Sequence, residues 1–146
     1  MFKPSEEIHI KAAYTLSTNL KHKHAKKWIA SNGEALVSKQ ELQIYEYLLE
    51  QEGLHVEYEK AFQGTDRLVF PDFTIVNLIT HKEYIWEHFG MTNNDNYLNE
   101  IPKKLSWFNS QELRSIENGG RLIITYYRED SFFKEVAKFV DLIKKI

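Results

Sequence analysis

The sequence contains no cysteine. This excludes disulfide bonds and thiolate metal sites, and it favours a reducing compartment such as the cytoplasm. No apolar run is long enough to span a membrane. The first eleven residues, MFKPSEEIHIK, lack the apolar core of a signal peptide. We therefore expect a cytoplasmic protein that has no membrane partner.

A strong excess of charge of either sign is also absent. The formal net charge is −2 and the sequence pI is about 6.3. Any binding of nucleic acid must then rely on local basic patches, because the overall charge does not favour it. The 146 residues are 42% hydrophobic and 27% charged. This balance is typical of one globular domain with a buried core.

The most basic stretch is KHKHAKKW, at residues 21–28. Apolar residues recur every four positions before it, so we expect a helix over residues 5–30. Its ammonium groups can bind DNA phosphates, and the alternative is a solvated basic face. We assign residues 1–32 to a helical extension and residues 33–146 to the main domain. The lysines concerned are Lys21, Lys23, Lys26 and Lys27.

The main domain alternates between helical and strand patterns. Ser38 followed by Glu41 has the spacing of a capping box, which marks the start of a helix. Strands and helices joined by one crossover predict an α/β domain of three layers, with the core order α-β-β-β-α-β-α. The expected helices cover residues 38–51, 97–113 and 131–146, and the expected strands cover residues 55–60, 71–79, 83–89 and 121–127.

The central stretch, PDFTIVNLITHKEYIWEHFGM at residues 71–91, is predicted to form a β-hairpin with its turn at residues 80–82. Side chains alternate between the two faces of a strand, and the hairpin is expected to place Asp72 and Glu87 side by side. Glu87 lies within the aromatic sequence YIWEHF, where an ionised carboxylate is costly without a partner. A divalent metal ion is one such partner. The alternative is that both are acids at strand edges with no further role.

These motifs together resemble a known superfamily. A helix with a glutamate, then a strand, then PD at a strand start, then a glutamate on the return strand resembles the PD-(D/E)XK nucleases. The segments VSKQELQIYEYL, YEK, PDFTI, YIWEHFGM and LIIT occur in this order. They are similar to a nuclease-like domain of mostly uncharacterised bacterial proteins, with relatives attached to superfamily 1 helicases. The resemblance covers about residues 33–128 and implies a restriction-endonuclease-like αβββαβ core, with an N-terminal helical extension and a C-terminal helix.

The resemblance implies a nuclease that hydrolyses DNA phosphodiester bonds with Mg²⁺, for which Mn²⁺ can substitute. Asp72 matches the aspartate of the PD motif, Glu87 matches the acid of the (D/E)XK motif, and Glu41 matches the helix glutamate. All three are implied to be catalytic and to ligate the metal, and oxygen ligands of this kind suit Mg²⁺. The implied partners are DNA and a helicase or other nucleic-acid-processing protein. For Glu41, a capping role alone is the alternative.

The chain departs from the superfamily pattern at the motif lysine, which lies two residues after the acid. Here that residue is Phe89. Lys104 shares a helical stripe with residues expected to face the sheet, so it is the expected replacement. His88 is adjacent to Glu87 but faces the other side of the strand. If neither replaces the lysine, the chain is an inactive module that binds DNA or a partner protein, or a structural part of a larger machine.

Overall fold

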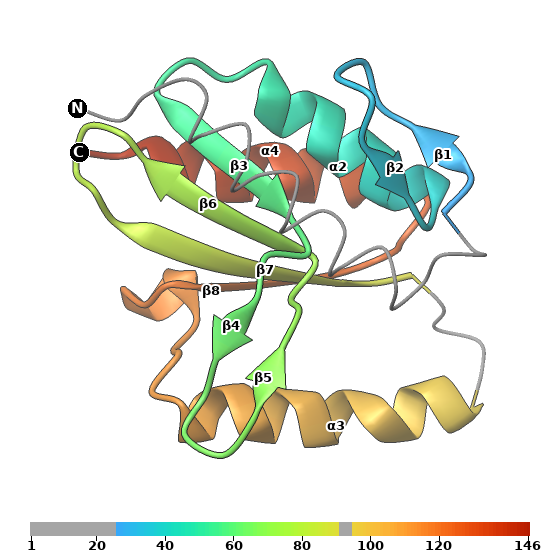
Figure 1. Ribbon diagram of the computed structural model, residues 1–146, viewed down its shortest axis with the longest axis vertical. Coiled ribbons are helices and arrows are strands. Elements are labelled where there is room, and N and C mark those ends of the chain that lie inside the picture. Colours follow the sequence, from blue (N-terminus) through green and yellow to red (C-terminus); the bar gives the residue numbers. More distant parts are fainter. Residues whose placement is uncertain (1–25, 91–94) are drawn as a thin grey trace.

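The computed structural model describes residues 26–90 and 95–146 (Figure 1). This part of the chain is a mixed α/β domain built on a four-stranded sheet in the order β3-β6-β7-β8. The pairs β3–β6 and β6–β7 are antiparallel, whereas β7 and β8 are parallel. The strands are β3 (Leu54–Tyr58), β6 (Phe73–Asn77), β7 (Glu83–Phe89) and β8 (Leu122–Tyr126).

Helices cover both faces of this sheet (Figure 1). α2 (Lys39–Leu49) and α4 (Phe132–Lys144) pack on one face, where they form the larger hydrophobic core with side chains such as Trp86. α3 (Asp95–Ser110) packs on the other face, where Phe108 joins Ile85 and Leu122 in a second cluster. β7 lies between the layers, so six of its seven residues are buried. The described elements therefore confirm an α/β domain with helices on both sides of a mixed sheet.

The helix boundaries follow from local chemistry. Ser38 caps α2 as expected, because its hydroxyl accepts a hydrogen bond from Glu41 N at 3.1 Å. α3 continues through Pro102, although a proline inside a helix removes one backbone hydrogen bond. The expected apolar stripe of α3 nevertheless faces the sheet, with Ile101 and Phe108 buried. Lys104 lies within this helix, one turn before Phe108.

Two expectations about strands and helices were wrong. Residues 26–30 are not helical: β1 (Trp28–Ile29) pairs with β2 (Ala35–Leu36), so a small hairpin crosses the boundary drawn between residues 32 and 33. Leu78 and Ile79 are not buried strand residues but exposed turn residues. β6 ends at Asn77 because the Asn77 Oδ1 accepts hydrogen bonds from the N–H groups of residues 79 and 80.

An additional hairpin lies between β3 and β6. β4 (Phe62–Gln63) and β5 (Leu68–Val69) form a separate two-stranded sheet that reaches from the end of the main sheet towards α3 (Figure 1). Both of its strands lie outside the strand ranges expected from the sequence. A short 3₁₀ helix (Ile116–Asn118) joins α3 to β8.

No helix among the described residues is long and apolar enough to cross a membrane.

Candidate functional site

Asp72 and Glu87 lie side by side at the end of the β6–β7 hairpin, as the hairpin alternation predicted. Phe73 pairs with Trp86 in the register, so the preceding Asp72 is opposite Glu87. The backbone N–H of Asp72 donates to Glu87 Oε1 at 2.9 Å, and the backbone N–H of His88 donates to Asp72 Oδ2 at 2.7 Å. Backbone groups of one strand therefore hold the carboxylate of the other, which fixes both on the face that α3 covers.

Glu41 approaches these two carboxylates from α2. Its N-terminal position on the helix follows from the Ser38 cap, but its carboxylate does not complete a capping box. Instead, Glu41 Oε1 accepts a hydrogen bond from the hydroxyl of Tyr58 at 2.7 Å. Tyr58 is the last residue of β3 and is itself fully buried. The side chain of Glu41 is thus turned towards the sheet by a partner that the sequence analysis did not identify.

Burial and mutual repulsion act on the protonation of this cluster. Burial raises the pKa of Glu41 from 4.5 to about 7; the Tyr58 hydrogen bond opposes this shift, and the charges of Glu59 and Glu87 add to it. Burial also raises the pKa of Asp72 well above its usual value, with further contributions from Glu87 and Glu41. These shifts show that the carboxylates are close enough to interact, and that the site favours a positive charge.

Two further charged residues, Glu59 and Lys26, belong to this cluster. Neither was expected there from the sequence. Glu59 is buried and has a positive φ of 51°, a conformation uncommon for a residue with a side chain. Its carboxylate forms an ion pair with the Lys26 ammonium at 2.5 Å, and both side chains are only 3% exposed. Lys26 therefore does not lie on a solvated basic face. Lys27 is exposed, whereas Lys21 and Lys23 lie outside the described residues.

Lys104 lies next to Glu87. Its ammonium nitrogen is 3.9 Å from Glu87 Oε2 and 5.9 Å from the centre of the Phe89 ring. The neighbouring Lys103 instead pairs with Glu100 on the exposed side of α3, at 3.3 Å. Phe89 points to the same face of the sheet, where its ring stacks on Tyr126. Position 89 of β7 carries no charge. The structure instead places a cation from α3, the Lys104 ammonium, beside Glu87.

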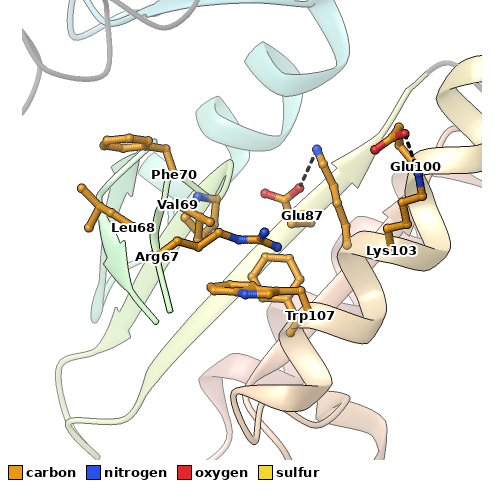
Figure 2. A pocket seen from close by; sticks show the side chains of 11 residues that line it. Arg67, Leu68, Val69, Phe70, Glu87, Glu100, Lys103 and Trp107 are labelled. Carbon is orange, nitrogen blue, oxygen red and sulfur yellow. Dashed lines mark hydrogen bonds and ion pairs between the residues drawn. The ribbon is translucent and has the colours of Figure 1, made fainter. Parts of the chain in front are cut away.

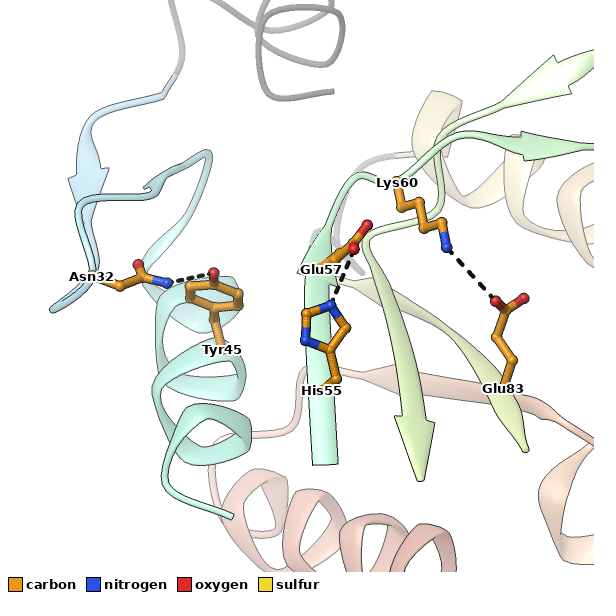
Figure 3. A network of polar contacts seen from close by, with 6 residues as sticks. All are labelled: Asn32, Tyr45, His55, Glu57, Lys60 and Glu83. Carbon is orange, nitrogen blue, oxygen red and sulfur yellow. Dashed lines mark hydrogen bonds and ion pairs between the residues drawn. The ribbon is translucent and has the colours of Figure 1, made fainter. Parts of the chain in front are cut away.

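Lys60 follows β3 and is another cation near this end of the sheet. Its ammonium lies 3.8 Å from Glu83 Oε2, at the start of β7 (Figure 3). Asn32 and Tyr45 form a separate contact between the first hairpin and α2, and His55 contacts Glu57 along β3 (Figure 3). These contacts hold the edges of the domain together, and they leave Lys104 as the lysine paired with Glu87.

His88 lies on the opposite face of β7, as the alternation of side chains predicted. It is buried, and burial lowers its pKa to about 4. Its Nδ1 is 2.8 Å from Thr125 Oγ1, and its Nε2 is 2.7 Å from Gln40 Oε1. Thr125 Oγ1 also accepts a hydrogen bond from Trp86 Nε1 at 3.0 Å. A neutral His88 that donates from Nε2 satisfies every contact, so this network ties α2 to β7 and β8 and fixes Gln40 beside Glu41.

The donor set fits a divalent cation such as Mg²⁺. Four carboxylates, of Glu41, Glu59, Asp72 and Glu87, and two ammonium groups, of Lys26 and Lys104, meet here, so these six groups sum to −2 when all are ionised. Among residues 26–90 and 95–146, no group of three or more histidine and acidic side chains is arranged so that it could hold a metal ion. Mg²⁺ commonly uses only one or two carboxylates and completes its shell with water and phosphate oxygens.

A groove opens beside Glu87, between α3 and the segment that follows the turn of the β4–β5 hairpin. Its volume is about 610 Å³. Figure 2 shows Glu87 at its centre, with Arg67 reaching in from the hairpin and Trp107 lying on α3 below. Lys103 and Lys104 also line it. Glu87 is therefore the acid of the pair that lines a cleft of the size that ligands occupy, and Asp72 lies behind it.

Fold and site together define a mixed α/β domain with paired carboxylates at the end of a central hairpin, one of which, Glu87, lines a groove that also carries Arg67, Lys103 and Lys104. Neither a scan against protein-family models nor a search of curated proteins finds a match for this chain.

Proposed function

We propose that this chain is a metal-dependent nuclease that hydrolyses DNA phosphodiester bonds, with Mg²⁺ as its metal and Mn²⁺ as a substitute. The observation that carries the proposal is the Lys104 ammonium beside Glu87, on the same face as Asp72. Two acids and a lysine at one point are the minimum that the chemistry needs, because a phosphodiester brings negative charge and the reaction adds more.

The order and pairing of the elements support a restriction-endonuclease-like core for this proposal. The chain runs α2-β3-β6-β7-α3-β8, with one crossover helix between the parallel strands β7 and β8. The acids occupy the second and third strands of this order and the first helix. The β4–β5 hairpin is an insertion between the first two of these strands.

In the proposed site, Asp72 and Glu87 would hold the metal, and Glu41 would reach it through a bound water molecule. The bound ion would activate a water molecule and stabilise negative charge on the phosphate. Lys104 would bind a non-bridging phosphate oxygen and neutralise its charge. The backbone donors at Asp72 and His88 hold the carboxylates in place, so the ligands need little rearrangement when the substrate arrives.

Cleavage of DNA with and without Mg²⁺ or Mn²⁺ tests the proposal. We expect the purified chain to degrade DNA in either metal and to be inactive in EDTA. Asp72→Asn should abolish cleavage, because it removes a charge but keeps the size of the side chain. Asp141→Asn, at an exposed position of α4 on the other face of the sheet, is the control and should leave the rate close to that of the wild type. Equal rates for wild type and Asp72→Asn would contradict the proposal.

A second candidate is an inactive module that binds DNA through the same face. Phe89 favours it, since this ring occupies the position of the motif lysine and is packed between Tyr97 and Tyr126. Such a module would bind DNA and leave it intact in every metal. The exposed Lys27 is a proposed phosphate contact under either candidate, as are Lys21 and Lys23, which lie outside the described residues.

A further inference from the structure

The groove beside Glu87 has a wall that is fixed before any ligand binds. The tip of the β4–β5 hairpin is attached to the last turns of α3: the backbone N–H of Thr65 donates to Gln111 Oε1 at 2.8 Å, and Trp107 Nε1 donates to Asp66 Oδ1 at 2.8 Å. Gly64 lies so close to Trp107 that a Cβ there would be 2.4 Å from the indole ring. The hairpin therefore arches from the sheet to α3, and these contacts hold its tip against the helix.

The lining of this groove combines three cations and two acids, Glu87 and Glu100, with apolar surface. Arg67 projects from the hairpin, with its guanidinium 4.9 Å from the centre of the Trp107 ring. Lys103 enters from α3, where its side chain is 74% exposed and its ion pair with Glu100 is a weak surface contact. Apolar side chains line the groove on the hairpin side, namely Leu68, Val69, Phe70 and Pro71.

This combination matches an unpaired nucleotide better than a base pair. A duplex presents its phosphates and its base edges, while stacking hides the faces of its bases. An unpaired base exposes an apolar face that gains from apolar and aromatic surface, next to a phosphate that gains from cations. An arch that joins the hairpin to α3 also narrows the approach to Glu87 on this side.

We propose that the groove binds single-stranded DNA, with unpaired bases against the wall of residues 68–71 and the backbone along Arg67 and Lys103. The inference rests on the proposed function in one respect: the strand in the groove is the one presented to Asp72 and Glu87. It makes the substrate a single strand, an overhang or a frayed end of DNA.

Binding without metal tests this inference separately from cleavage. The affinities of the wild-type chain for fluorescein-labelled oligo(dT) and for a blunt hairpin duplex would be measured by anisotropy in EDTA at several salt concentrations. We expect the single strand to bind at least tenfold more tightly. Arg67→Gln and Lys103→Gln should each weaken binding of the single strand and reduce its log–log salt slope by about 0.7.

Lys138→Gln is the matched control, because Lys138 is also an exposed helix lysine in a surface ion pair but lies on α4. It should change neither affinity nor slope. Equal or tighter binding of the duplex would contradict the proposal that the groove binds single-stranded DNA. Arg67→Gln and Lys103→Gln variants that bind the single strand as Lys138→Gln does would also contradict it. If the single strand binds in a way that depends on Arg67 but is never cleaved, the proposal for the groove stands and the proposal of a nuclease fails. If duplex DNA is cleaved in a metal-dependent way and both the Arg67→Gln and the Lys103→Gln variant behave like the wild type, the proposal of a nuclease stands and the proposal for the groove fails.

Discussion

The Lys104 ammonium lies 3.9 Å from Glu87 Oε2, although the two residues come from different elements on one side of the sheet. The same ammonium lies 5.9 Å from the Phe89 ring. A lysine at position 89 would project from β7 near this point. Because residue 89 is an uncharged phenylalanine, Lys104 of α3 supplies the positive charge beside Glu87. The proposed site thus keeps a cation at the acid while Phe89 adds to the packing under α3.

Lys104→Ala should reduce DNA cleavage by about 100-fold, the usual order for loss of one group that stabilises developing charge. The reduction should appear in kcat, since Lys104 acts on the reacting phosphate. Lys103→Ala is the comparison: Lys103 pairs with Glu100 away from the acids, so its loss should raise KM through weaker binding in the groove and leave kcat nearly unchanged. Steady-state rates on single-stranded DNA measure both. Equal losses of kcat in the two variants would show that Lys104 has no special role.

The stability of the metal-free protein should fall as the pH rises from about 4.5 to 7. The pKa of Glu41 is 4.5 when unperturbed and about 7 in the folded state, so the folded protein binds more protons than the unfolded chain in this window. Raising the pH removes that advantage, which amounts to on the order of 3 kcal/mol for this shift. Urea unfolding in EDTA between pH 5 and pH 8 measures it.

Glu41→Gln is the control for this pH effect, because an amide oxygen still accepts the Tyr58 hydrogen bond but does not ionise. Its stability should be less dependent on pH than that of the wild type over the same window. If the two proteins lose stability in parallel, Glu41 is not the group responsible.

Thr125→Val should destabilise the fold by about 2 kcal/mol. The substitution preserves shape but removes the hydroxyl that both His88 and Trp86 contact, leaving buried polar groups without a partner. Thr74→Val provides the comparison, since Thr74 is buried on β6, two strands away from β8, and lies outside this network. Thermal unfolding in the same buffer should separate them. A Thr125 variant as stable as the Thr74 variant would mean that the network contributes little.

Where local pattern determines geometry, the sequence was sufficient. Alternation along two strands of a hairpin brings Asp72 and Glu87 together, and helical periodicity turns Lys104, but not Lys103, towards the sheet. Both relationships follow from fixed repeats of the backbone. The Ser38 cap follows in the same way from a contact three residues away.

Where geometry depends on distant contacts, the pattern was not sufficient. The Lys26–Glu59 ion pair joins the first hairpin to a residue of positive φ after β3, and no periodicity encodes it. Leu78 and Ile79 look like strand residues by composition, but the side chain of Asn77 ends the strand before them. The β4–β5 hairpin is attached to α3 through Trp107 and Gln111, which are separated from it by more than 40 residues.

Anomalous scattering from crystals soaked in Mn²⁺ tests the central claim most directly, because it locates the metal without reference to activity. We predict one strong peak within ligand distance of carboxylate oxygens of both Asp72 and Glu87, on the side of the sheet that carries Lys104. The peak should be absent from Asp72→Asn crystals treated in the same way. Well-diffracting wild-type crystals with no manganese at these two carboxylates, or with manganese only at other residues, would contradict the account.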